Sequence, residues 1–221
     1  MWDLNGIAAT FQRDIRDRVV TWPDAARPRP VHYNCWEAVY FRHSLPELTE
    51  MADRAAALGA ERFVLDDGWF GGRRNDKTSL GDWTVSPDIF PNGLGPLIAH
   101  VKSRGMDFGL WVEPEMVSPD SDFYRAHRSG CLHAHDRERP TMRGQLVLNL
   151  LDPAISDAVF RQIDALLREY DIAYLKWDHN RDLFPAKARV GSVRNSQTQY
   201  FYALLDRLRA AHPQVEIESC A

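Results

Sequence analysis

The stretch 146–180, LVLNLLDPAISDAVFRQIDALLREYDIAYLKWDHN, decides the fold because it has the pattern of a strand, a helix and a second strand. Its two ends, 146–152 and 173–180, are short apolar runs typical of buried strands. Between them, Asp152 is a good helix N-cap residue, and Pro153 suits the first helical position, where its missing N–H is not needed. We therefore expect two strands joined through a helix.

The same alternation covers most of the chain. The sequence predicts four more strands, over 30–36, 62–70, 107–115 and 215–221, and further helices over 45–59, 94–105 and 197–212. In the first of these helices the apolar residues recur at helical spacing, and a glycine follows as a stop signal. Strictly alternating strands and helices predict the α/β class, with a parallel sheet and the helices outside it.

Polar and aromatic residues gather where the predicted strands end. They are Trp36, Glu37, Asp66, Asp67, Trp111, Glu113, Glu115, Asp178 and Asn180. No glycine-rich phosphate turn follows the first strand, which argues against an open dinucleotide-binding sheet. In a (β/α)8 TIM barrel the strand ends form one rim that carries the active site. We expect an incomplete TIM barrel with about six of its eight βα units, the sixth strand ending at Ala221.

Composition and charge exclude several classes of protein. The 221 residues carry a net charge of -4, with no basic stripe that would favour nucleic acid as a partner. No apolar run approaches the roughly 20 residues that span a bilayer, and the first residues do not resemble a signal peptide. The odd number of cysteines, with no close pair, fits a reducing compartment. We expect a cytoplasmic protein with neither nucleic acid nor membrane as a partner.

The strand 173–180 raises a choice between two interpretations. Side chains alternate along a strand, so Tyr174, Lys176, Asp178 and Asn180 share one face. A structural ion pair between Lys176 and Asp178 is one interpretation. The other is a strand that delivers polar groups into a pocket.

The neighbouring motifs favour the pocket. Asp66 and Asp67 either reach into it or cap the turn before a glycine. Trp36, Trp69 and Trp111 are flat surfaces of the kind that stack on a sugar ring, although core packing also explains a tryptophan. Carboxylates, a lysine and aromatic residues without a set of metal ligands suggest a glycoside, whose hydrolysis usually needs paired carboxyl groups and no metal.

Two loops have a weaker functional pattern. Cys131, His133 and His135 alternate in a charged segment, but no C-x-x-C or H-E-x-x-H spacing accompanies them, so a polar surface or rim loop is preferred over a zinc site. The segment 71–83, GGRRNDKTSLGDW, lacks the spacing of a phosphate-binding loop and is interpreted as solvated. We expect neither a metal nor a cofactor.

Six motifs occur in one order along the chain: NCWEAVYF (34–41), LDDGWF (65–70), GDW (81–83), GLWVEPEMVSPDSD (109–122), YLKWDHNRD (174–182) and ESC (218–220). With them the chain resembles the catalytic domain of the family 36 glycoside hydrolases, the melibiase-type α-galactosidases. The resemblance implies a retaining TIM-barrel hydrolase that removes terminal α-D-galactosyl residues from oligosaccharides of the raffinose and melibiose type. The aspartate of K-W-D, here Asp178, would be its nucleophile.

The resemblance also implies the remaining site residues. Asp66 and Asp67 would bind galactose hydroxyls, and the sugar pocket would be lined by Trp36, Trp111, Arg143, Lys176 and Cys220. Asn180, on the strand face of Asp178, would hydrogen-bond the sugar or hold the nucleophile. The family's acid/base aspartate follows a glycine-rich segment beyond the ESC motif, so this chain is expected to lack it and to be inactive as an isolated fragment.

The resemblance further implies a division of the chain. Residues 1–28 would be a linker that enters the barrel, and residues 29–221 a partial catalytic barrel truncated at its C-terminus. The full-length form is a candidate homo-oligomer. Three alternatives stay open: a galactosyl-transferring synthase, an α-N-acetylgalactosaminidase, and a noncatalytic carbohydrate-binding remnant.

Overall fold

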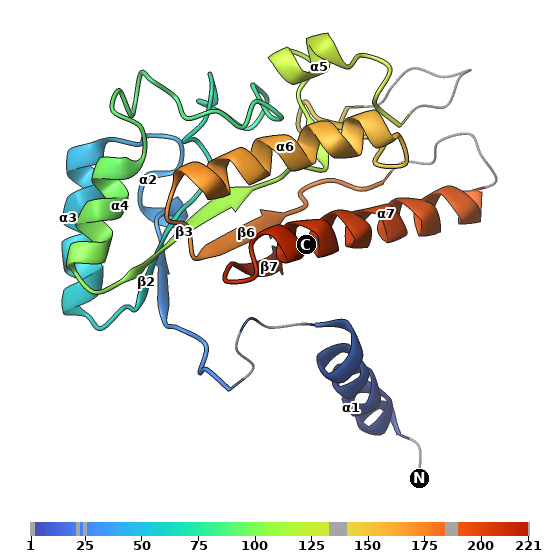
Figure 1. Cartoon of the computed structure of the whole chain (residues 1–221), viewed down its shortest axis with the longest axis horizontal. Helices are drawn as coiled ribbons and strands as arrows, with labels where there is room; N and C mark the ends of the chain where they lie inside the picture. Colours follow the sequence, from blue (N-terminus) through green and yellow to red (C-terminus); the bar gives the residue numbers. More distant parts are fainter. Residues whose placement is uncertain (1–2, 21–22, 24–25, 133–140, 184–189, 221) are drawn as a thin grey trace.

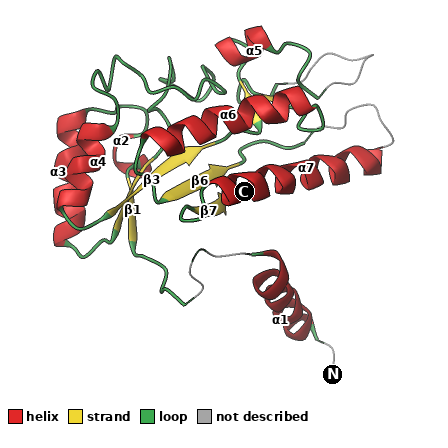
Figure 2. Ribbon diagram, in the orientation of Figure 1, coloured by secondary structure: helices red, strands yellow, loops and turns green. Residues whose placement is uncertain are grey.

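The computed structural model describes residues 3–20, 23, 26–132, 141–183 and 190–220. Its centre is a five-stranded sheet in which every neighbouring pair is parallel (Figures 1 and 2). The order across the sheet is β1 (His32–Asn34), β2 (Arg62–Leu65), β3 (Asp107–Val112), β6 (Tyr174–Asp178) and β7 (Glu216–Cys220). Within the described ranges β1 and β7 each have one neighbouring strand, so this part of the sheet is open at both edges.

Four long helices follow strands, as the alternation predicts, and two short ones, α2 (Trp36–Val39) and α5 (Asp122–Ala126), lie in loops. The long helices are α3 (Leu45–Ala57), α4 (Gly95–Ser103), α6 (Pro153–Glu169) and α7 (Val190–Ala211). α3 packs against α4, and α6 packs against α7 (Figure 1). The predicted start of α6 is confirmed, because Asp152 accepts a hydrogen bond from the Ala154 amide at 2.9 Å and Pro153 is the first helical residue.

The prediction of a sheet strand over 146–152 is wrong. Only Leu146–Val147 form a strand there, β5, which pairs antiparallel with β4 (Met116–Val117) in a separate small sheet. β3 pairs directly with β6, so the described residues form a main sheet of five strands rather than six. The segment is apolar because most of its side chains are buried, and a short apolar run does not show which partner an extended segment will have.

Residues 4–19 form a helix, α1 (Leu4–Asp14), followed by a π-helical turn, η1 (Ile15–Val19). Asp3 caps α1 by accepting a hydrogen bond from the Gly6 amide at 2.7 Å. None of the residues of α1 is buried, and the helix lies apart from the sheet (Figure 1). In the part of the chain that the structure describes, no helix is both long enough and apolar enough to cross a bilayer.

Gly109 lets β3 approach its neighbours closely. A Cβ atom built at this position would lie 2.7 Å from Cδ1 of Tyr174 and 3.1 Å from Cγ2 of Val64. Tyr174 has little room to move, because it is 3% exposed and the Arg62 guanidinium lies 4.5 Å from the centre of its ring. A side chain at position 109 would therefore push β2 and β6 away from β3.

We expect Gly109→Ala to lower the free energy of unfolding by about 1–3 kcal/mol, the usual cost of overpacking a core. The matched control is Gly95→Ala at the start of α4, where an added Cβ meets no atom within 4 Å. That control should be neutral or slightly stabilising, since alanine has the higher helix propensity. Urea denaturation of both variants measures the difference, and equal midpoints for the two would contradict the close packing.

Candidate active site

Asp178, the last residue of β6, lies at the centre of the polar groups that gather where the strands end. Its Oδ2 accepts hydrogen bonds from Nε1 of Trp111 at 2.9 Å and from Nδ2 of Asn180 at 2.7 Å. Its Oδ1 accepts one from the His179 amide at 2.9 Å. Cys220 is its register partner on β7, and burial, followed by the charge of Asp178, raises the pKa of this thiol. Four of the predicted residues are therefore together.

Asp66, directly after β2, is the partner of Lys176. The Lys176 Nζ donates to Oδ2 of Asp66 at 2.9 Å, and Nδ2 of Asn34 donates to the same oxygen at 2.5 Å. The direct ion pair that the sequence suggested between Lys176 and Asp178 is thus replaced by one that joins β6 to the loop after β2. Burial acts to lower the pKa of Lys176, but the charge and hydrogen bond of Asp66 outweigh it, and the pKa is raised.

Asp67 is held by a buried arginine. Nε and Nη2 of Arg73 donate to its two carboxylate oxygens at 2.9 and 2.8 Å, and both side chains are almost fully buried. Burial raises the pKa of Asp67, and the hydrogen bonds and charge of Arg73 oppose that rise. The prediction that the loop 71–83 is solvated is wrong for Arg73, Leu80 and Trp83, which are buried.

The three tryptophans have different surroundings. Trp69 is fully buried and donates its Nε1 to the Trp111 carbonyl oxygen at 2.9 Å, so core packing explains it and the sugar-stacking interpretation is wrong. Trp111 is also buried, but its indole N–H reaches Asp178. Trp36 is half-buried, packs edge-on against Tyr40 and Phe41, and keeps an accessible surface beside the site.

Arg143 lies in a turn and has a positive φ of 53°. Its Nε is 3.7 Å from Oδ2 of Asp76, and its charge acts to lower the pKa of Asp67. Of the weaker loop pattern, His133 and His135 lie outside the described residues, while Cys131 is buried. No cluster of three metal-ligating side chains occurs among the residues with described positions, and no disulfide joins the three cysteines, all of which are described.

Three residues of the site have contacts that the sequence did not predict. Asn34 accepts a hydrogen bond from the Trp36 amide at 2.8 Å and so links that residue to Asp66. Arg73 stands in a loop whose composition suggested solvent exposure. Glu113 was noted only as a polar residue at a strand end, yet it is fully buried and accepts a hydrogen bond from the Asn180 amide at 2.5 Å. Its position after a buried strand, with apolar residues before it, was the available signal.

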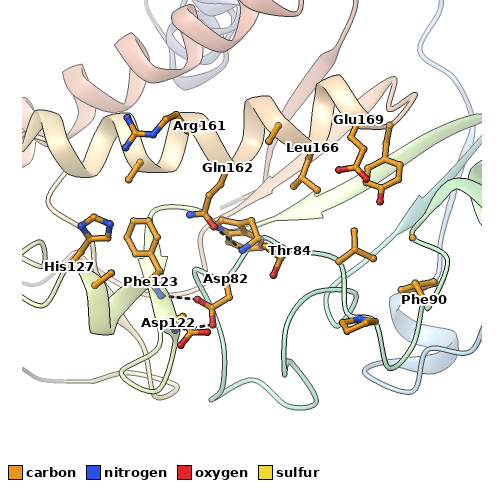
Figure 3. A pocket seen from close by; sticks show the side chains of 18 of the residues that line it. Asp82, Thr84, Phe90, Asp122, Phe123, His127, Arg161, Gln162, Leu166 and Glu169 are labelled. Carbon is orange, nitrogen blue, oxygen red and sulfur yellow. Dashed lines mark hydrogen bonds between the residues drawn. The ribbon is translucent and has the colours of Figure 1, made fainter.

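A separate hollow of about 900 Å³ lies between α6, α5 and the loop 82–93 (Figure 3). Its lining includes Arg161, Gln162 and Glu169 from α6, with His127 and Phe123 opposite. Asp82 accepts hydrogen bonds there from the amides of residues 122 and 123. None of the residues around Asp178 lines this hollow, so it is not the predicted sugar pocket.

Comparison with known proteins assigns the chain to a family. The family model described as Melibiase matches residues 2–221. The chain is 48% identical over 218 residues to an α-galactosidase of Escherichia coli, covering 99% of this chain and 31% of that protein. The crystal structure of α-galactosidase AgaA from Geobacillus stearothermophilus superposes with a TM-score of 0.90 at 39% identity, covering 98% of this chain and 31% of that one. The chain thus spans about a third of these relatives' length, and it belongs to the melibiase family.

Proposed function

We propose that this chain forms the galactoside-binding and nucleophile-bearing part of a retaining α-galactosidase, within a (β/α)8 barrel to which it contributes five parallel strands. The position of Asp178 carries the proposal. Its carboxylate ends a central strand and is oriented by three neutral N–H donors, and among the described residues it has no ion pair. A carboxylate that is oriented but not neutralised is suited to nucleophilic attack.

In the proposed reaction an oxygen of Asp178 forms a bond to the anomeric carbon while the bond to the leaving oxygen breaks, giving a covalent glycosyl-enzyme. A second group has to protonate the leaving oxygen and later activate water. Asp66, Asp67, Glu113 and Glu115 each accept hydrogen bonds from protein groups, and we assign that second role to none of them.

The neighbouring groups would bind the sugar. Lys176, which is paired with Asp66, and the half-buried Trp36 lie near the carboxyl ends of the strands, as Asp178 does. We propose that Asp66 and Asp67 accept hydrogen bonds from galactose hydroxyls and favour the axial 4-hydroxyl over the equatorial one of glucose, since an unpaired buried acceptor costs affinity. The names of the relatives support a galactoside, and variants of AgaA have been solved with stachyose and with raffinose.

The test is covalent labelling of the 221-residue chain with a fluorinated α-galactosyl fluoride. Fluoride leaves without protonation, so the labelling does not depend on a general acid. We expect a hexose-sized mass increase that maps to the peptide containing Asp178, and no increase with the gluco-configured reagent. An adduct on another residue, or equal labelling by both reagents, would contradict the proposal.

A further inference from the structure

Asn180 connects two carboxylates. Its backbone N–H donates to Oε1 of Glu113 at 2.5 Å, and its side-chain Nδ2 donates to Oδ2 of Asp178 at 2.7 Å. The second oxygen of Glu113 accepts from Nε2 of Gln145 at 3.3 Å. Gln145 is itself fully buried, so the Glu113 side of this hydrogen-bond network lies in the interior. The backbone N–H and the side-chain amide of Asn180 therefore each donate a hydrogen bond to a carboxylate.

Glu113 does not contact a substrate in this arrangement, because it is 0% exposed, whereas Asp66 and Asp67 are 2% and 4% exposed. A buried carboxylate without its own cation is costly. Arg73, whose charge acts on Glu113, uses Nε and Nη2 to hold Asp67. Packing alone therefore gives no reason for a charged group at position 113.

We propose that Glu113 is a positioning residue that fixes Asn180 and, through its amide, the orientation of the Asp178 carboxylate. This inference rests on the proposed role of Asp178 as the nucleophile. The ionised form of Glu113 accepts a charge-assisted hydrogen bond from the Asn180 N–H, which is stronger than the bond to the neutral acid. Its negative charge also favours the positive charge that develops on the sugar in the transition state.

The ionisation of Glu113 gives the proposal a pH dependence. Burial raises its pKa to about 7; the hydrogen bonds of Asn180 oppose the rise and the charge of Asp178 adds to it. The other charged groups that act there are Arg73 and His179. Because the folded-state pKa is raised, the contribution of Glu113 to stability is full only below its ordinary pKa of 4.5 and is lost as the pH rises from there through about 7. Above this pH Glu113 is ionised, and the ionised form lowers the stability of the fold while it assists the proposed reaction.

The experiment is the pH dependence of labelling by the fluorinated galactosyl fluoride, in the whole chain and in Glu113→Gln. We expect the wild-type rate to fall about tenfold between about pH 8 and about pH 6, since small misplacements of reacting groups have effects of this order or larger. The variant should show the low rate throughout, without an inflection. It should fold, because a rotation of the Gln145 side-chain amide would bring its Oε1, which is buried without a partner among the described residues, toward the new amide group to accept a hydrogen bond from it.

Glu115→Gln is the matched control. Glu115 is also buried but accepts from Nε1 of Trp177 at 3.2 Å and lies 3.3 Å from Nδ1 of His179. The hydrogen bond and charge of Glu115 raise the pKa of His179, so Glu115→Gln tests whether the imidazole of His179, rather than Glu113, causes the inflection. The inflection should persist in Glu115→Gln. Its loss there, or its persistence in Glu113→Gln, would overturn the inference.

A second measurement separates this inference from the proposed function. The ¹⁵N shift of the Asn180 amide should titrate near pH 7 in the wild type and stay flat in Glu113→Gln. A flat wild-type titration would overturn the link between Glu113 and Asn180. If the amide titrates as expected but no galactosyl adduct forms on Asp178, the proposed nucleophile is wrong while the hydrogen-bonded link is supported.

Discussion

The Asp178→Asn variant is expected to keep its fold and to lose at least about a thousandfold in the rate of labelling by the fluorinated galactosyl fluoride. An amide has the shape of a carboxylate, and its oxygen can still accept from Trp111 and Asn180 at the position of Oδ2. Only the hydrogen bond from the His179 amide to Oδ1 is lost, at a cost of about 1 kcal/mol in the free energy of unfolding. The negative charge that attacks the anomeric carbon is gone.

The control for this variant is Asp206→Asn, the same chemical change on a side chain of α7 that is 77% exposed. Intact-protein mass spectrometry over time gives the labelling rates, and urea denaturation shows whether both variants are folded. Asp206→Asn should react at the wild-type rate. If Asp178→Asn is folded and reacts within about tenfold of the wild type, the nucleophile lies elsewhere.

The alternation of apolar runs was sufficient to predict the parallel sheet and its helices. The signals used are local in the sequence. The cap at Asp152 and the glycine after α3 each act within one helix end, so neighbouring residues are enough to identify them. The alternation of buried and half-buried side chains along β6 is also a local property. Leu175 and Trp177 are buried on one face, while Lys176 and Asp178 are half-buried at the site. The expected placement of Lys176 and Asp178 on one face of the strand is therefore confirmed.

The sequence could not show which distant residue or strand a given side chain or strand would contact. Lys176 bonds to Asp66, 110 positions away, rather than to Asp178 on its own strand, because the sheet order places the loop after β2 within its reach. Leu146 and Val147 are as apolar as a sheet strand, but they pair with β4. Such contacts depend on the tertiary arrangement, which a periodic pattern does not encode.

Arg73 is the residue for which sequence reasoning failed most, and its replacement has the largest expected effect on stability. It is fully buried, bonds both oxygens of Asp67, and donates Nη1 to the Thr78 carbonyl oxygen at 3.0 Å. Arg73→Met would leave the carboxylate of Asp67 buried and without its cation. Removing one partner of a buried ion pair usually costs about 3–5 kcal/mol, and we expect a loss of this size at neutral pH.

The neighbouring Arg74 is the matched control, because its side chain is 36% exposed and its ion pair with Asp88 is at the surface. Arg74→Met should cost about 1–2 kcal/mol, since it loses the exposed ion pair and the hydrogen bond from Nη2 to Oγ of Ser86 at 2.7 Å. Urea denaturation at several pH values measures both variants. A loss in Arg73→Met no greater than in Arg74→Met would show that the buried pair does not stabilise the loop.

The pH dependence of the loss identifies its cause. Burial already raises the pKa of Asp67 in the presence of Arg73, and removing the arginine raises it further. A carboxyl group whose folded-state pKa is raised destabilises the fold only as the pH climbs above its unfolded-state pKa, so the loss in Arg73→Met should shrink as the pH is lowered toward about 4.

Adding Asp67→Asn to Arg73→Met should restore at least about half of the lost stability at neutral pH, since the uncompensated charge is removed. A loss that is independent of pH, and unchanged in the double variant, would assign the effect to packing around Phe41 and Phe70, over whose rings the guanidinium lies, rather than to the charge of Asp67.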